Sequence, residues 1–160
     1  MTARGPKVLI VDDEASIRQS LHGVLSDENY DCTAVDSGEA CLDELARGAF
    51  EAVLLDIWMP GIDGLATLAQ IQKIPAESRP AVIMISGHGN IETAVKATKL
   101  GAFDFVEKPL TIEKVSVVLN NAVKQRRMDQ ELQRLQEAVG HPEIIGSSVP
   151  MKALRQQLKL

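Results

Sequence analysis

The sequence predicts an α/β fold in which helices cover a parallel β-sheet. Two observations in residues 1–122 lead to this class. Short apolar runs rich in β-branched residues alternate with longer segments whose apolar residues recur at helical spacing. Each run is followed by one such segment, which is the order expected of repeated βα units. With 160 residues, 45% of them hydrophobic, the chain can form one ordinary core and an appendage.

Five strands are predicted from the apolar runs. They span Lys7 to Val11, Cys32 to Val35, Ala52 to Leu55, Ala81 to Ile85 and Phe103 to Val106. The segments after the first three runs carry apolar residues that share one helix face. These residues are Ile17, Leu21, Val24 and Leu25, then Cys41, Leu42 and Leu45, then Leu65, Leu68 and Ile71. A covering helix is therefore expected after each strand.

Capping residues mark the starts of the later helices. Asp36 stands three residues before Glu39, which is the spacing of a capping box. Asn90 precedes the apolar Ile91, and Thr111 opens the segment after the fifth strand.

The last helix is predicted to be unusually long. It runs from Thr111 to Val139 without a breaker, roughly 40 Å at 1.5 Å per residue, until Gly140 and Pro142 stop it. This exceeds what is needed to cover a five-stranded sheet, so residues 123–142 are predicted to form a linker helix.

The linker helix carries a pattern typical of a short coiled-coil seam. Apolar positions follow a 4-3-4 spacing with charged flanks, over less than two heptads. They are Met128, Leu132, Leu135 and Val139. Such a seam would pair two chains in parallel, and a solvent-exposed linker helix is the alternative.

Charge is unevenly distributed along the chain. Residues 1–122 hold 10 Lys and Arg against 18 Asp and Glu, whereas residues 123–160 hold 7 against 4. An acidic first segment disfavours nucleic-acid binding, because phosphate neutralisation needs a basic face. It favours a cation site, with a solvated acidic surface as the alternative.

Neither a membrane segment nor a cysteine framework is expected. The longest apolar runs are far shorter than the roughly 20 residues of a membrane span, and no signal segment opens the chain. Cys32 and Cys41 lack partners at metal-ligand spacing, so buried packing roles are expected. The sequence thus predicts a soluble, cytoplasmic protein.

Polar residues able to support chemistry stand at the ends of four predicted strands. Asp12 and Asp13 follow the first strand, Asp56 ends the third, Ser86 ends the fourth and Lys108 follows the fifth. Because parallel strands end at one edge, where such folds bind ligands, these side chains are expected to converge. For any single residue, a helix cap or a solvated turn is the alternative.

Three converging carboxylates require a positive partner. Each close pair costs on the order of 4 kcal/mol at about 4 Å and an effective dielectric near 20. Lys108 offsets one charge, and oxygen ligands with an open side suit Mg²⁺, which often joins carboxylates to a phosphate. A Mg²⁺ or Mn²⁺ site is therefore predicted.

Asp56 is the best candidate for a nucleophilic carboxylate. It ends an apolar strand and precedes a loop, residues 57–64, whose proline and glycines favour a tight turn. A carboxylate can accept a phosphoryl group when a metal and an ammonium neutralise the equatorial oxygens.

Four blocks of this sequence resemble the signature blocks of two-component response-regulator receivers. They are Val11-Asp12-Asp13-Glu14, Asp56-Ile57-Trp58-Met59-Pro60-Gly61, Ile85-Ser86-Gly87 and Glu107-Lys108-Pro109. The resemblance implies a receiver domain over residues 1–122, with the flavodoxin-like strand order 2-1-3-4-5 and helices on both faces of the sheet. It also implies Mg²⁺-dependent transfer of a phosphoryl group from a sensor histidine kinase to Asp56.

The resemblance also implies roles for the individual site residues. Asp13 and Asp56 ligate the metal directly, Asp12 does so directly or through water, and the backbone carbonyl of Trp58 completes the protein ligands. Lys108 pairs with the phosphoryl group, and the Ser86 hydroxyl swings to hydrogen-bond it. A cis peptide bond before Pro109 is common in the family.

Further roles implied by the resemblance concern switching and lifetime. Phe105 replaces the family's usual tyrosine, so it would switch by packing alone; a plain core aromatic is the alternative. Trp58 and His88 occupy positions that tune the lifetime of the acyl phosphate. We expect the Trp58 indole to slow hydrolysis, and a solvated loop residue is the alternative for His88.

Residues 143–160 resemble the start of the AAA+ ATPase domain of NtrC-like, sigma54-dependent transcription activators. No phosphate-binding G-x-x-x-x-G-K-[ST] motif occurs, so no ATPase activity is expected of this chain. Trp58 points to the NtrX branch. The expected partners are a histidine kinase, a second copy bound through the fourth and fifth helices and the linker, and downstream AAA+ and DNA-binding domains. Neither nucleic-acid nor membrane contact is expected.

Other function classes fit the sequence less well. A haloacid-dehalogenase phosphatase needs D-x-D at one strand end, an α/β-hydrolase needs a G-x-S-x-G elbow around Ser86, and a Rossmann oxidoreductase needs G-x-G-x-x-G after the first strand. A degenerate receiver that acts as a phosphorylation-independent interaction module is the remaining alternative.

Overall fold

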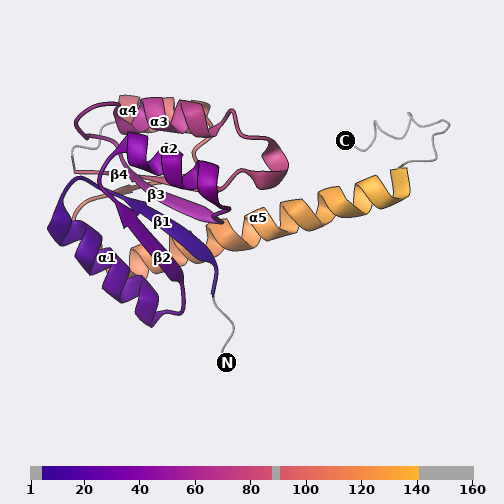
Figure 1. Cartoon of the computed structure of the whole chain (residues 1–160), viewed down its shortest axis with the longest axis horizontal. Helices are drawn as coiled ribbons and strands as arrows, with labels where there is room; N and C mark the ends of the chain where they lie inside the picture. Colours follow the sequence, from indigo (N-terminus) through magenta and orange to yellow (C-terminus); the bar gives the residue numbers. More distant parts are fainter. Residues whose placement is uncertain (1–4, 88–90, 141–160) are drawn as a thin grey trace. The chain divides into compact units, whose positions relative to one another are not determined.

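The computed structural model describes residues 5–87 and 91–140. The chain divides into two compact units, one ending at Arg126 and the other beginning at Arg127. The first unit holds one five-stranded sheet (Figure 1). Its strands are β1 (Lys7–Val11), β2 (Asp31–Val35), β3 (Ala52–Asp56), β4 (Ala81–Ser86) and β5 (Asp104–Glu107).

All strand pairs are parallel, and the order is β2-β1-β3-β4-β5. The predicted flavodoxin-like fold is confirmed. Four strands have both ends within one residue of the predicted ends, and both ends of β5 lie one residue closer to the C-terminus than predicted. Apolar runs thus located all five strands to within one residue at each end.

Helices cover both faces of the sheet. They are α1 (Ala15–Asp27), α2 (Gly38–Arg47), α3 (Gly64–Ile71), α4 (Ile91–Lys99) and α5 (Ile112–Gly140), with a short 3-10 helix at Ala76–Ser78. The buried residues of α1 and α5 pack on one face, and those of α2, α3 and α4 pack on the other (Figure 1).

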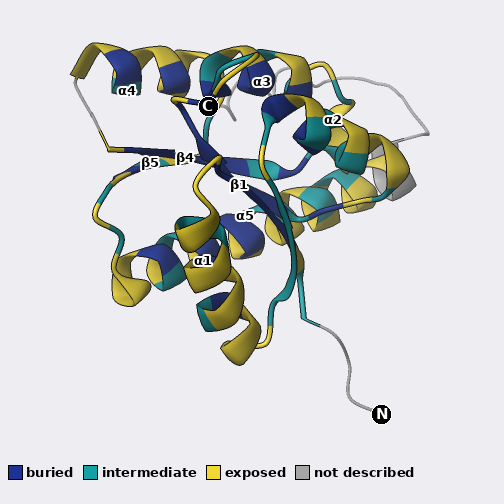
Figure 2. Cartoon of the chain, turned by 60° about the vertical axis from the view of Figure 1, so that its left-hand side comes forward, coloured by how far each residue is buried: buried dark blue, intermediate teal, exposed yellow. Residues whose placement is uncertain are grey.

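Successive residues of the strands belong to opposite cores. In β1, Val8 and Ile10 face the α1 and α5 side, whereas Leu9 and Val11 face the other helices. Every residue of β3 is buried, as expected of a central parallel strand, and Figure 2 shows the exposed residues of α1 on its side away from the sheet. Cys41 is buried, and its pKa is raised to about 12 by burial.

The helix caps differ in part from the prediction. Ser37, rather than Asp36, caps α2, because its hydroxyl accepts a 3.1 Å hydrogen bond from the Ala40 N–H. Asp63 caps α3 by accepting from the Ala66 N–H at 2.8 Å, and Thr111 caps α5 as predicted. The predicted cap Asn90 lies outside the described residues.

The burial of apolar residues in helix α5 decreases along its 29 residues. Its first part buries Val115, Leu119 and Ala122 in the core. In the second unit, the apolar Met128, Leu132 and Leu135 are exposed. The predicted coiled coil and the boundaries after residues 122 and 142 stay predictions. No helix in the described part of the chain is apolar over a length that would span a membrane.

Candidate functional site

The carboxyl edge of the sheet brings the predicted polar residues together. Asp12 follows β1, Asp56 and Ser86 are the last residues of β3 and β4, and Lys108 follows β5. The backbone continues its pairing just beyond the strands: the Lys108 N–H donates to the Ser86 carbonyl at 2.8 Å. The backbone that carries Lys108 is therefore tied directly to the end of β4.

Three carboxylates form a cluster at this edge. Asp12, Asp13 and Asp56 each offer an oxygen, and these oxygens all lie within 4.8 Å of one another. Asp12 and Asp56 are only 1% and 3% exposed, whereas Asp13 is exposed. The cluster thus has two buried members and one that opens to solvent.

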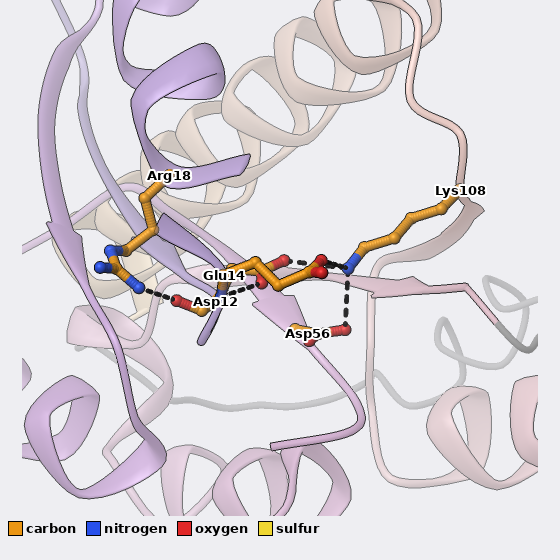
Figure 3. Close-up of polar contacts among 5 residues, drawn as sticks. All are labelled: Asp12, Glu14, Arg18, Asp56 and Lys108. Atoms are coloured by element: carbon orange, nitrogen blue, oxygen red, sulfur yellow. Dashed lines mark hydrogen bonds and ion pairs between the residues drawn. The ribbon is translucent and has the colours of Figure 1, made fainter. Parts of the chain in front are cut away.

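Lys108 supplies the positive charge next to the cluster. Its Nζ lies 3.2 Å from Oδ2 of Asp12, 3.7 Å from Oδ1 of Asp56 and 3.5 Å from Oε1 of Glu14 (Figure 3). The Lys108 side chain is 18% exposed, so these contacts are partly shielded from water. One ammonium therefore faces three carboxylates.

The pKa values reflect this imbalance of charge. Burial raises the pKa of Asp56 to about 6; the charges of Asp12 and Asp13 also raise it, and Lys108 lowers it. Burial alone would lower the pKa of Lys108, but the contact with Asp12 and the charges of Asp56 and Glu14 outweigh burial and raise it. Burial and the neighbouring carboxylates therefore disfavour the ionised form of Asp56.

The donor set fits a small divalent cation. Within the described residues, Oδ2 of Asp12 is a buried oxygen without a hydrogen-bond partner, despite its ion pair with Lys108. Carboxylate oxygens, one of them open to solvent, are what Mg²⁺ prefers. Asp12, Asp13 and Asp56 are therefore able to hold such an ion together with water.

The loop after Asp56 is shaped by glycine. A Cβ on Gly64 would lie 2.3 Å from the Asp56 carbonyl oxygen, so only glycine fits there. The Gly64 N–H donates to the Ile57 carbonyl at 2.7 Å and closes the loop. Gly61 has a φ of 80°, which favours glycine. The start of α3 is thereby held against the backbone of the candidate nucleophile.

The remaining predicted residues lie in distinct environments. Ser86 is fully buried, and Phe105 is half-buried against the α2–α4 side of the core. The Trp58 side chain belongs to the loop after Asp56 and is 52% exposed. The Lys108-Pro109 peptide bond is cis, as predicted. His88 lies outside the described residues.

Two contacts of the site were missed from the sequence. Arg18 donates from Nη1 to the Asp12 carbonyl at 2.8 Å, and Glu14 contacts Lys108 (Figure 3). The available signal was position: Glu14 directly follows the two aspartates, and Arg18 lies one helical turn later. These positions do not predict that Glu14 contacts Lys108, which is 94 residues away in the sequence.

The family is decided by a sequence comparison that covers most of the first unit. The sequence model of the response regulator receiver domain matches residues 8–120. The chain belongs to the response regulator receiver domain family. In this receiver domain, the predicted acidic, hydroxyl and lysine residues stand at the carboxyl ends of four strands, β1, β3, β4 and β5.

Among its relatives, the receiver domain is similar to nitrogen regulators. The whole chain is 38% identical over 150 residues to the nitrogen assimilation regulatory protein NtrX of Azorhizobium caulinodans, covering 92% of this chain and 33% of that protein. It resembles the crystal structure of the receiver domain of NtrX from Brucella abortus, with a TM-score of 0.68 and 43% identity, covering 73% of this chain and 98% of that one.

A third relative is known in an activated form. The solution structure of the beryllofluoride-activated NtrC4 receiver domain dimer matches with a TM-score of 0.71 and 35% identity, over 75% of this chain and 98% of that one. The chain spans about a third of the length of the NtrX relatives that it matches. The prediction of an NtrC-like receiver, related to NtrX, is confirmed.

Proposed function

We propose that this receiver domain takes a phosphoryl group onto Asp56 from a phosphohistidine of a sensor kinase. The observation that carries the proposal is the buried Asp56 carboxylate beside two further aspartates and the Lys108 ammonium. In the transfer, the N–P bond of the donor breaks while an Oδ–P bond forms on Asp56. The leaving imidazole nitrogen keeps the electron pair of the broken bond and is free to take a proton.

The residues around Asp56 have separate tasks in this proposal. Asp12, Asp13, Asp56 and the Trp58 carbonyl would hold Mg²⁺ or Mn²⁺. A bound ion of this kind supplies positive charge that offsets the equatorial phosphoryl oxygens. Lys108 pairs with one of these oxygens, because its Nζ already lies 3.7 Å from Asp56. The hydroxyl of Ser86 hydrogen-bonds another, since Ser86 follows Ile85, the residue of β4 that pairs with Asp56.

The output surface is proposed to be the face formed by α4, β5 and α5. Ile91 and Val95 on α4 and Val117 on α5 are exposed apolar side chains. An open groove of about 520 Å³ on this face is lined by Ile91, Phe105 and Val118, among others. Repacking of Phe105 after phosphorylation would change this face, and with it dimerisation.

The wider context is also a proposal. The receiver domain would act in the cytoplasm and control AAA+ and DNA-binding domains of a sigma54-dependent activator, through the helix that ends at Gly140. The chain itself is proposed to act as a switch that assists its own phosphorylation and dephosphorylation, rather than as an ATPase. The alternative is an interaction module that works without phosphorylation.

Phosphorylation with a small donor separates these two functions. We expect Mg²⁺ and acetyl phosphate to give an acid-labile mass increment on the wild type and on Asp36→Asn, a control that removes an exposed carboxylate after β2. Asp56→Asn should give none. Beryllofluoride with Mg²⁺ should also change Trp58 fluorescence. An unmodified wild type without this response would support the interaction module instead.

A further inference from the structure

Glu14 stands apart from the other two carboxylates that contact Lys108. Asp12 and Asp56 belong to the acidic cluster fitted to a cation, whereas Glu14 does not. Its Oε1 lies 3.5 Å from the Lys108 Nζ, and Figure 3 shows its side chain extending toward that ammonium. Glu14 is therefore a partner of Lys108 whose charge a bound cation would leave in place.

The backbone of Glu14 is fixed while its side chain is free to reach across the site. The Glu14 N–H donates to Oδ1 of Asp12 at 2.9 Å, and its carbonyl accepts from the Arg18 N–H at 3.1 Å. Glu14 is the N-cap residue of α1, yet its side chain makes no capping hydrogen bond. The side chain is 60% exposed and lies at the opening of the cluster.

We propose that Glu14 is a positioning residue: it holds Lys108 at the opening of the acidic cluster before phosphorylation and competes with the phosphoryl group for its ammonium. The inference rests on the proposed function. Once a cation compensates Asp12 and Asp56, Glu14 is the carboxylate that still attracts Lys108. A phosphoryl group on Asp56 then has to take the ammonium away from Glu14.

Two substitutions separate this contact from a general effect of charge. Glu14→Gln removes the charge, and Glu14→Asp keeps it but shortens the side chain by one methylene, which breaks a contact already at 3.5 Å. Because aspartate is a favoured N-cap residue, the Glu14→Asp substitution should not destabilise α1. Asp36→Asn is the matched control, since it removes one exposed charge after β2.

The first measurement is the affinity for beryllofluoride at saturating Mg²⁺, followed by Trp58 fluorescence. We expect Glu14→Gln and Glu14→Asp to tighten binding by about twofold to fivefold, the upper range of an exposed ion pair, and Asp36→Asn to leave it unchanged. Wild-type affinity in Glu14→Asp would overturn the inference, because charge alone would then explain Glu14→Gln.

The second measurement uses the protein saturated with Mg²⁺ but without beryllofluoride, so that the cation compensates Asp12 and Asp56 while Glu14 keeps its contact with Lys108. The ¹³C relaxation of the Lys108 ε-methylene should show greater mobility in both Glu14 variants and no change in Asp36→Asn. Unchanged mobility would overturn the inference. If the wild type did not bind beryllofluoride, the proposed function would fail, whereas the relaxation data would still decide whether Glu14 restrains Lys108.

Discussion

Adjacent aspartates have different environments in this protein. Asp12 is buried at the end of β1, whereas the next residue, Asp13, is exposed. The Asp12 carboxylate also accepts from the Glu14 N–H, and its carbonyl accepts from Arg18. Asp12 is thus held rigidly, and Asp13 is the member of the pair that is open to an incoming ion and its water.

Asp56→Asn should stabilise the metal-free protein at neutral pH. The pKa of Asp56 is about 6 in the folded protein, whereas its ordinary value, which applies to the unfolded chain, is 3.8. The folded state therefore binds the proton more tightly than the unfolded state does. Ionised Asp56 therefore lowers stability above pH 6, and this loss disappears as the pH falls through 6 toward 3.8.

We expect Asp56→Asn to raise the free energy of unfolding by about 1–2 kcal/mol at pH 7.5, after allowance for solvent screening. Urea unfolding in EDTA at several pH values measures this. The gain should vanish below pH 4. A gain that stayed constant with pH would show that Asp56 ionisation is not its cause.

Trp58→Asn should shorten the lifetime of the phosphorylated protein. The indole lies two residues after Asp56 on the exposed loop, where it would restrict the approach of water. We expect the decay rate to rise by about threefold to tenfold, which corresponds to roughly 1 kcal/mol of barrier. Release of phosphate after removal of the donor measures the rate. Trp58→Phe, which keeps a bulky ring, should decay like the wild type, and equal rates in all three would exclude the shielding role.

At the scale of elements, the loop between β3 and α3 depends on close backbone packing. The Cβ that alanine would add at Gly64 meets the backbone of Asp56 and Ile57, which cannot move without shifting the nucleophile. By contrast, a Cβ on Gly23, within α1, meets nothing within 4 Å. These two glycines thus offer a matched pair of substitutions.

Gly64→Ala should cost about 2–4 kcal/mol of stability, because overpacking forces a backbone shift. Gly23→Ala should instead stabilise the protein by about 0.5–1 kcal/mol, the helix propensity difference. Chemical denaturation measures both. Equal effects of the two substitutions would contradict the close approach at Gly64.

At the scale of the whole molecule, two apolar surfaces are candidates for self-association. The first is the α4 and α5 face of the first unit, where Ile91 is 83% exposed. The second is the row of Met128, Leu132 and Leu135 in the second unit. We propose that a dimer that responds to phosphorylation uses the first surface, because that surface adjoins Phe105.

Ile91→Asp should abolish the effect of beryllofluoride on oligomeric state. We expect Leu132→Asp to weaken association at least about tenfold, near 1.4 kcal/mol, both with and without beryllofluoride. Sedimentation velocity across a concentration series measures both. If Ile91→Asp left the response to beryllofluoride intact, the α4 face would not be the output surface.

Local patterns carried most of the fold prediction. Apolar periodicity located five strands and their helices, since burial of one helix face or of a whole parallel strand leaves a mark on neighbouring residues. The prediction of Asp36 as the N-cap of α2 was wrong, because Asp36 and Ser37 are adjacent and both can cap a helix. Local sequence does not decide whether the carboxylate or the hydroxyl reaches a free N–H. The α3 cap at Asp63 was likewise missed.

The sequence by itself determined the fold class and the residues gathered at the carboxyl edge of the sheet, because both follow from short-range spacing and strand direction. The family followed from the resemblance of four sequence blocks to the signature blocks of receivers. The tertiary structure decided the burial of Asp12 against the exposure of Asp13, the raised pKa of Asp56 and the contact of Glu14 with Lys108. These properties depend on distances between side chains from different strands, which spacing along the chain does not fix.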